Sequence, residues 1–168
     1  MRIADRIQKL KPSATLSVNA KALELKSQGR EIISLSVGEP DFPTPAHVVE
    51  AATKAMAPGM VRYTQVPGIP ELREAAAGYF SKAYGVSASM ENIIVSNGGK
   101  HSLYNLFQCL LNPGDEVLIP SPYWVSYPDM VALAEGVPVF VPSSPKNKFL
   151  ISPEDLVKKI TPRSRVLI

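Results

Sequence analysis

Apolar and polar residues follow two different patterns along the chain. In the first half, apolar residues recur at helical spacing, as Val18, Ala22 and Leu25 do. This spacing predicts helices over residues 18–28, 45–57 and 70–84, with one short strand at residues 32–37. Later in the chain, short apolar runs alternate with helical segments. The runs predict strands at residues 92–96, 116–119, 137–141 and 165–168, with helices between them at residues 99–111, 124–134 and 152–160.

The predicted strands are almost continuously apolar, as in Val117–Ile119 and Val139–Val141. Such runs are typical of parallel strands whose two faces are both covered by helices. The sequence therefore predicts an α/β fold with three layers around a mainly parallel sheet. The run at residues 165–168 resembles the start of a further buried strand, and a sheet that stopped there would leave an apolar edge. We therefore expect the chain to be truncated relative to the complete fold.

Prolines and glycines mark the boundaries between the predicted elements. Pro45, Pro70 and Pro153 stand where helices begin, and Thr44 and Ser152 precede two of them as possible capping residues. Three prolines and a glycine in residues 38–45 exclude regular structure there and predict an extended loop.

Composition and charge limit which kinds of partner the protein is expected to bind. The net charge of +3 is small and no basic stripe occurs, so nucleic acid is not an expected partner. No apolar run reaches the roughly 20 residues of a membrane span, and the first ten residues do not form a signal peptide. We expect a cytoplasmic protein without a metal site. Its only cysteine, Cys109, lies in an apolar stretch and is expected to be buried.

A pair of glycines lies between a predicted strand and a predicted helix. Residues 93–102 run from an apolar strand through Gly98 and Gly99 into the next helix. Free N–H groups at a helix start, without side chains beside them, suit a phosphate group. The spacing matches neither a Walker loop nor the dinucleotide-binding fingerprint. A tight turn that binds no ligand is an equally good interpretation of this motif alone.

An aromatic pair follows the next strand. Residues 120–124 end in Tyr123 and Trp124 and lie at the carboxyl edge of the sheet, where open α/β folds bind ligands. A tryptophan there could stack on a flat ring. A tryptophan packed at the start of a helix is at least as compatible with the sequence.

These motifs, in their order along the chain, resemble the class I, fold type I aminotransferases, which depend on pyridoxal 5'-phosphate. The resemblance is carried by residues 11–15, 36–42, 62–64, 68–73, 96–100, 113–117 and 120–124. Within the family the chain is most similar to aspartate aminotransferases of the aspartate/prephenate type, over their N-terminal part. The resemblance implies that residues 1–45 form a helical arm and part of the small domain. Residues 46–168 would then be the first part of the large domain.

The resemblance also implies roles toward the cofactor. The N–H groups of Gly99 and Lys100 would bind its phosphate, and Trp124 would stack on its pyridine ring. Tyr63 would reach the phosphate held by the other subunit of a homodimer. An ordinary loop tyrosine is the alternative for Tyr63.

For the substrate, the resemblance implies Gly38, Lys100, Trp124 and Lys11. Gly38 would lie beside the substrate carboxylate, where a side chain would block it. A cation at Lys100 can bind the distal carboxylate of aspartate or glutamate, and Lys11 could act similarly. Lys11 could instead be a solvated surface lysine, and Gly38 a plain turn glycine.

The implied reaction moves the amino group of aspartate, or of another dicarboxylic amino acid, to 2-oxoglutarate. No catalytic residue is expected within these 168 residues, because the family's imine lysine and carboxylate-binding arginine would lie beyond Ile168. The chain alone is therefore expected to be inactive. Aromatic, prephenate, alanine and kynurenine aminotransferases remain alternatives, as does a non-catalytic sensor or pseudoenzyme domain.

Overall fold

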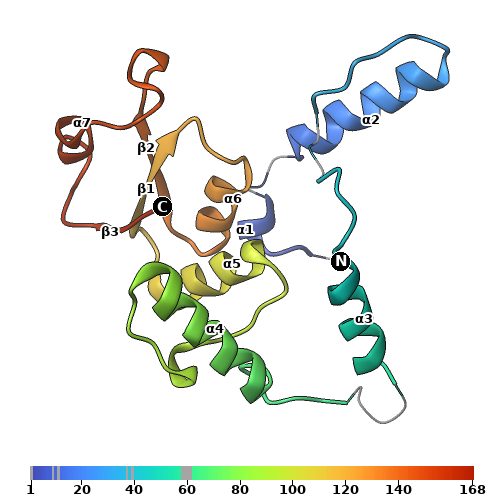
Figure 1. Ribbon diagram of the computed structural model, residues 1–168. Helices are drawn as coiled ribbons and strands as arrows, with labels where there is room; N and C mark the ends of the chain where they lie inside the picture. Colours follow the sequence, from blue (N-terminus) through green and yellow to red (C-terminus); the bar gives the residue numbers. More distant parts are fainter. Residues whose placement is uncertain (1, 9, 11, 37, 39, 58–61) are drawn as a thin grey trace. The chain divides into compact units, whose positions relative to one another are not determined.

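A computed structural model describes residues 2–8, 10, 12–36, 38, 40–57 and 62–168 (Figure 1). The chain divides into two compact units. Unit 1 contains Met1–Val37 and Gly98–Ile168, and unit 2 contains Gly38–Asn97. The predicted domain boundary at residue 45 stays a prediction.

Unit 1 holds the sheet. Its elements in chain order are α1 (Asp5–Gln8), α2 (Ala14–Ser27), α5 (Gly99–Leu110), β1 (Glu116–Ser121), α6 (Ser126–Leu133), β2 (Val137–Pro142), the 3-10 helix η2 (Pro145–Asn147), α7 (Pro153–Val157) and β3 (Ser164–Leu167). Unit 2 contains α3 (Ala46–Ala55), α4 (Pro70–Tyr84) and the 3-10 helix η1 (Met90–Asn92).

The three strands form one parallel sheet in the order β2-β1-β3. This confirms the predicted α/β class and the parallel sheet. The central strand β1 is buried over Glu116–Ile119, as its apolar run predicted. The outer strand β2 is less covered than predicted, since Val137 and Phe140 are about two-fifths exposed.

Two helices cover one face of the sheet. Phe107 and Leu111 follow one face of α5 and its end, and Met130, Val131 and Ala134 come from α6 and its C-cap. These side chains pack with Val117 and Ile119 of β1 in one core cluster. On the other side of the strands in Figure 1 lies α7, which contacts β2. Helices thus lie on both sides of the sheet.

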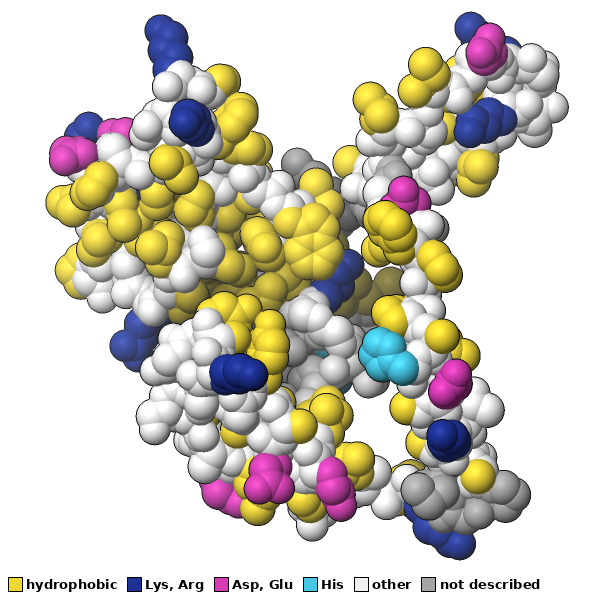
Figure 2. Space-filling model, viewed as in Figure 1, with side chains coloured by type: hydrophobic (Ala, Val, Ile, Leu, Met, Phe, Trp, Pro, Cys, Tyr) yellow, Lys and Arg dark blue, Asp and Glu magenta, His cyan; other side chains and the backbone are white. Residues whose placement is uncertain are grey.

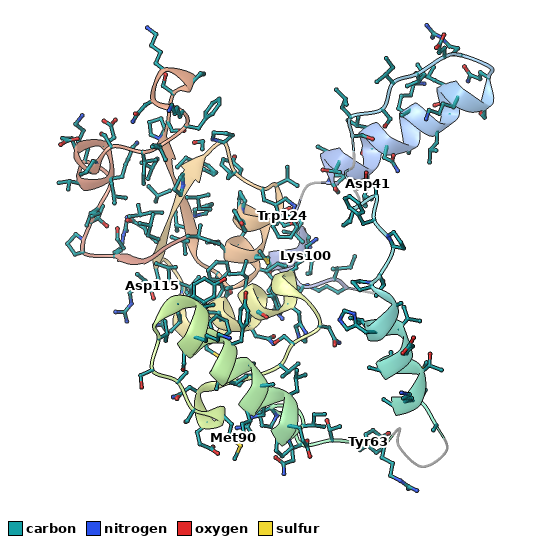
Figure 3. All side chains as sticks on the ribbon, in the orientation of Figure 1. Asp41, Tyr63, Met90, Lys100, Asp115 and Trp124 are labelled. Carbon is teal, nitrogen blue, oxygen red and sulfur yellow. The ribbon has the colours of Figure 1, made fainter. Side chains whose placement is uncertain are left out.

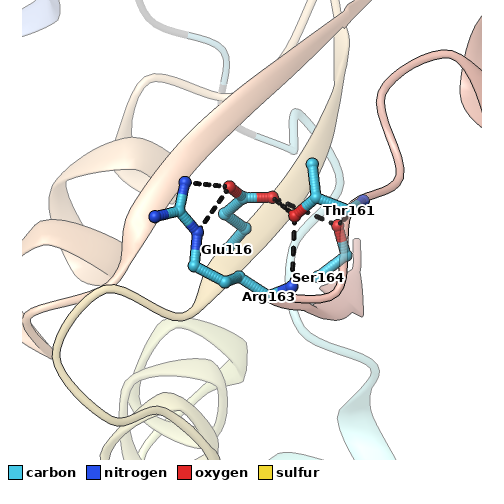
Figure 4. Close-up of polar contacts among 4 residues, drawn as sticks. All are labelled: Glu116, Thr161, Arg163 and Ser164. Atoms are coloured by element: carbon cyan, nitrogen blue, oxygen red, sulfur yellow. Dashed lines mark hydrogen bonds and ion pairs between the residues drawn. The ribbon is translucent and has the colours of Figure 1, made fainter.

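A buried carboxylate fastens β3 to β1 (Figure 4). The Glu116 side chain is 5% exposed and accepts hydrogen bonds from Thr161 Oγ1 at 2.6 Å and Ser164 Oγ at 3.2 Å. The Arg163 guanidinium donates to its other oxygen from Nη2 at 2.9 Å and Nε at 3.2 Å. The hydrogen bond from Thr161, followed by those from Arg163 and Ser164, holds the pKa of Glu116 below its usual value, against the opposing effect of burial.

This lowered pKa predicts how stability depends on pH. Because the folded-state pKa lies below the unfolded value of about 4.3, ionised Glu116 stabilises the fold above that pH. The stabilisation is lost as the pH falls through the folded-state pKa. We expect a Glu116→Gln variant of the full-length protein to be less stable than wild type near neutral pH, with a difference that shrinks below about pH 4. Urea denaturation over this pH range measures the difference.

The matched control is Glu31→Gln, which changes an exposed carboxylate in the same way. It should leave the stability close to that of wild type at every pH. A Glu116→Gln variant whose stability stayed a constant amount below wild type into acid would contradict the expected titration.

Two predicted strands are wrong. Residues 32–36 and 93–96 belong to no helix or strand, the described residues offer neither segment a neighbouring strand, and residue 92 belongs to η1. Ile33 and Leu35 are 88% and 93% exposed. Val95 donates its N–H to Pro67 O at 2.9 Å, a loop contact within unit 2. Residue 37, the end of the first predicted strand, lies outside the described residues.

The helix boundaries follow the capping signals in part. Pro70 begins α4, and Gly85 ends it in the left-handed conformation with φ 66°. Ser152 caps α7 through a hydrogen bond from the Asp155 N–H, as predicted. The prediction that Thr44 caps α3 is wrong, because Pro45 occupies the cap position and no side chain caps that helix. The helix α7 ends at Val157, earlier than predicted.

Cys109 is exposed, so its predicted burial is wrong. The helix α5 buries the face that carries Phe107, while Cys109 lies two residues further on and therefore projects from another side. An apolar stretch in a helix does not by itself show which of its members are covered.

Large hydrophobic side chains remain exposed on unit 1. Figure 2 shows them gathered over the part that holds β2 and α7, where Phe149, Leu150 and Val157 are each more than half exposed. Apolar surface of this kind is typical of an interface with further polypeptide. In the part of the chain that the structure describes, no helix combines the length and apolar character needed to cross a membrane.

Candidate functional site

The turn before α5 presents free backbone donors. Gly98 has φ 85°, a conformation that favours glycine, and no side chain caps the helix. A Cβ atom at Gly98 or Gly99 would meet no atom within 4 Å. Among the described residues, the N–H groups of Gly99 and Lys100 find no hydrogen-bond acceptor. The positive end of α5 is therefore open to an anion.

Lys100 and Trp124 lie together, as Figure 3 shows. The Nζ atom of Lys100 is 4.7 Å from the centroid of the Trp124 ring. Tyr127 contacts the same indole edge-on, with the ring centroids 5.4 Å apart. The tryptophan is 43% exposed, so it is not part of the closed core. The structure thus brings a cation and an exposed aromatic ring to one place.

These two side chains line an open pocket of about 530 Å³ in unit 1. The pocket is formed where the starts of α2, α5 and α6 meet. Its lining residues are Pro12, Ser13, Ala14, Thr15, Leu16, Lys100, Tyr123, Trp124, Val125, Ser126, Pro128 and Asp129. A cation, hydroxyl groups and aromatic rings in one pocket suit a flat ligand that carries negative charge.

The residues present fit pyridoxal phosphate. Its phosphate needs several donors and no nearby side chain, which the Gly98–Lys100 turn offers. Its pyridine ring needs an exposed aromatic face, and Trp124 in the same unit supplies one. These are the two parts of the cofactor that this chain could hold.

The other predicted site residues lie in unit 2 or outside the described residues. Tyr63 and Gly38 belong to unit 2, and the Tyr63 side chain is fully exposed. A Cβ atom at Gly38 would meet no atom within 4 Å, so the fold itself does not require glycine there. Lys11 lies outside the described residues. The roles of all three stay predictions.

Ser13 and Thr15 also line the pocket, although the sequence alone predicts no role for either. Ser13 caps α2, accepting a hydrogen bond from the Leu16 N–H at 3.4 Å. Both residues belong to the 11–15 motif that contributes to the family resemblance, and that motif is the sequence signal that could have identified them. The resemblance implied a role only for Lys11. Ser13 and the first turn of α2 line the pocket.

Comparison with known proteins identifies the family. The family "Aminotransferase class I and II" matches residues 30–168. The aspartate/prephenate aminotransferase of Thermus thermophilus is 52% identical over 166 residues, which are 99% of this chain and 43% of that protein. The aspartate aminotransferase of Geobacillus stearothermophilus is 49% identical over 168 residues, 100% of this chain and 43% of the relative.

Solved structures of aminotransferases have the same fold over nearly the whole length of this chain. The Thermus thermophilus aspartate aminotransferase with maleate superposes with a TM-score of 0.93 at 53% identity, covering 99% of this chain and 44% of that one. An alanine aminotransferase from Pyrococcus furiosus gives a TM-score of 0.93 at 31% identity, covering 99% of this chain and 43% of the other.

The chain belongs to the class I and II aminotransferases, a family of pyridoxal-phosphate-dependent transaminases. Its similarity is to the aspartate/prephenate aminotransferases of that family, and it spans about 43% of the length of the relatives that it matches.

Proposed function

We propose that the full-length protein containing this chain transfers the amino group of aspartate to 2-oxoglutarate with the help of pyridoxal phosphate. The observation that carries the proposal is the Lys100 ammonium group over the Trp124 ring, directly beside the free N–H groups of α5. Backbone donors, an aromatic ring and a cation that lie close together in unit 1 support this proposal.

Each residue has a distinct task in this proposal. The N–H groups of Gly99 and Lys100 bind the cofactor phosphate, and the Trp124 indole holds the pyridine ring in a fixed plane. The Lys100 ammonium binds the distal carboxylate of the substrate, which orients the substrate's amino end toward the ring. Bound pyridoxal phosphate supplies the electron sink for the bonds at the substrate's α carbon.

The charge of Lys100 and the comparison with a related structure both support a dicarboxylic substrate. Lys100 places a cation in the pocket, and the related Thermus thermophilus enzyme has been solved with maleate, a dicarboxylate. Neutral amino acids such as alanine would leave this cation without a partner. Prephenate, which also carries two carboxylates, is compatible with the same group.

The remaining parts of the proposal lie outside the 168 residues. We propose that further polypeptide supplies the lysine that binds the cofactor covalently and the arginine for the α-carboxylate. The exposed apolar side chains of unit 1 are surface that such polypeptide could cover. We further propose a cytoplasmic homodimer in which Gly38 lies beside the substrate and Tyr63 reaches the partner's cofactor phosphate. Lys11 would assist Lys100.

The test is steady-state kinetics of the full-length protein with 2-oxoglutarate as acceptor. Aspartate, alanine and phenylalanine are compared as donors, and prephenate is compared with phenylpyruvate as acceptor for the same donor. We expect aspartate to have the highest kcat/KM among the donors, by about tenfold or more, since one carboxylate–ammonium pair is worth that much. Equal kcat/KM values for aspartate and alanine would contradict the proposal, and absence of transamination with every pair would favour a non-catalytic domain.

A further inference from the structure

We infer that Tyr127 is a positioning residue for the Trp124 indole, and through it for the pyridine ring of the cofactor. In the proposed function Trp124 holds that ring, so the plane of the indole must itself be fixed by a neighbouring group. The inference rests on the proposed function in this respect. Both residues belong to unit 1.

The Trp124 side chain is not fixed by the hydrophobic core. It is 43% exposed and lies outside the buried core cluster. Its backbone belongs to residues 122–125 between β1 and α6, which form neither helix nor strand. The outer torsion angle of a tryptophan has broad energy minima, so an unsupported indole would sample several ring planes. Because a stacking surface binds best when it is already in place, the indole needs a rigid neighbour.

Tyr127 contacts Trp124 through its backbone and through its ring. The Tyr127 N–H donates to Trp124 O at 3.0 Å, which closes the turn that leads into α6. The centroids of the two rings are 5.4 Å apart, and the ring planes are nearly perpendicular at 86°. Aromatic pairs prefer this arrangement, because the positive edge of one ring meets the negative face of the other. Rotation of the indole about its side-chain bonds would break the contact.

Tyr127 is itself anchored in the fold. It lies in the first turn of α6 and packs against the core cluster, whose buried members include Val117 of β1 and Val131 of α6. A ring that packs both against the core and against Trp124 has little freedom to rotate. Tyr127 therefore connects the exposed indole to the closely packed interior of unit 1.

Two other side chains near the indole do not provide the same restraint. The Lys100 ammonium group is 4.7 Å from the indole centroid, but it ends a flexible stem and is assigned to the distal carboxylate of the substrate. Its contact with the ring changes when it binds that carboxylate. Tyr123 stacks on Phe140 of β2, with the centroids 4.8 Å apart and the planes at 14°, so its ring is held by the sheet. Tyr127 has neither of these other tasks.

The test separates the ring of the cofactor from its phosphate. Dissociation constants are measured by equilibrium dialysis for pyridoxal, which has the ring and no phosphate, and for inorganic phosphate, which has no ring. The full-length protein is used after removal of its bound cofactor. We expect Tyr127→Leu to raise the constant for pyridoxal by about threefold to tenfold, the size of one lost aromatic pair. The constant for inorganic phosphate should change by less than about twofold, because the N–H groups of α5 are unaltered.

Three further variants serve as controls. Tyr127→Phe keeps the ring, so both constants should stay within about twofold of wild type. Tyr104→Leu makes the same change at an exposed tyrosine of α5 and should alter neither constant. Trp124→Leu should raise the constant for pyridoxal, and adding Tyr127→Leu to it should have no further effect, because the tyrosine acts through the indole.

A second measurement reports on the orientation of the bound ring. Circular dichroism of the pyridoxal phosphate absorption band is recorded at saturating cofactor, so that every variant is equally occupied. Tyr127→Leu should change the intensity of this band, and Tyr127→Phe should leave it as in wild type. If Tyr127→Leu does not fold, Tyr127→Met is measured in its place, since methionine adapts to irregular packing. The same selective effect on pyridoxal is then expected at about twofold to fivefold.

Equal weakening of pyridoxal and inorganic phosphate by Tyr127→Leu, or no effect on either, would overturn the inference. An effect of Tyr127→Leu that persisted in the Trp124→Leu background would overturn it as well, because the tyrosine would then act by another route. If Trp124→Leu itself bound pyridoxal as tightly as wild type, the ring site of the proposed function would be contradicted, and the inference with it.

Discussion

Replacing Phe107 by alanine is expected to lower the free energy of unfolding by about 3–5 kcal/mol. Phe107 of α5 is fully buried and belongs to the core cluster that also contains Leu111, Val117 of β1 and Val131 of α6. Truncation removes the apolar contact and leaves a cavity that the surrounding strands and helices can only partly fill. Urea denaturation of the full-length protein, followed by circular dichroism, measures the loss.

Gln108→Ala is the control on the same helix. Gln108 is the next residue of α5 and is exposed and polar. We expect it to change the free energy of unfolding by about 0.5 kcal/mol or less, because it removes no buried apolar contact and leaves no cavity. Equal losses for the two variants would show that α5 packs by a different face from the one described.

The elements of unit 1 from α5 onward were largely predictable, because their signals are local. The apolar run Val117–Ile119 lies in β1, which is the central strand of the sheet and is buried there. Ser152 and Pro153 mark the start of α7 as its cap and its first residue. In unit 2, Pro70 and Gly85 mark both ends of α4. Each of these signals acts within a few residues of the structure that it determines.

Strand pairing was not predictable to the same degree. Residues 32–36 and 93–96 have the apolar, β-branched composition that strands favour. A strand also requires a hydrogen-bonded neighbour, and the described residues provide none. The composition of a segment contains no information about its partner, which is why both predictions were wrong.

In the candidate site too, the features set by neighbouring residues were predictable, and those set by packing between distant residues were not. The open turn at Gly98 follows from two consecutive glycines where a helix begins, which is a signal visible in the sequence. The contact between Lys100 and Trp124 joins the start of α5 to the segment before α6. It depends on how the start of α5 packs beside the segment between β1 and α6, so the sequence predicts only that each residue follows the end of an apolar run.

Replacing Lys100 by methionine is expected to lower kcat/KM for aspartate by about 10- to 100-fold in the full-length protein, the size of a lost carboxylate–ammonium pair. The effect should be selective because Lys100 has two separable tasks. Its backbone N–H at the start of α5 is unchanged by the substitution, so the proposed phosphate site is retained. Methionine also keeps an unbranched side chain next to Trp124.

The selectivity is measured by comparing aspartate with alanine as donors for the same variant. The value of kcat/KM for alanine should change by less than about twofold, because alanine has no distal carboxylate for the ammonium group to bind. Lys82→Met, at an exposed position near the end of α4, should leave both values unchanged. If Lys100→Met lowered both values equally, the side chain would act on the cofactor or the fold, and the dicarboxylate specificity would need a different cation.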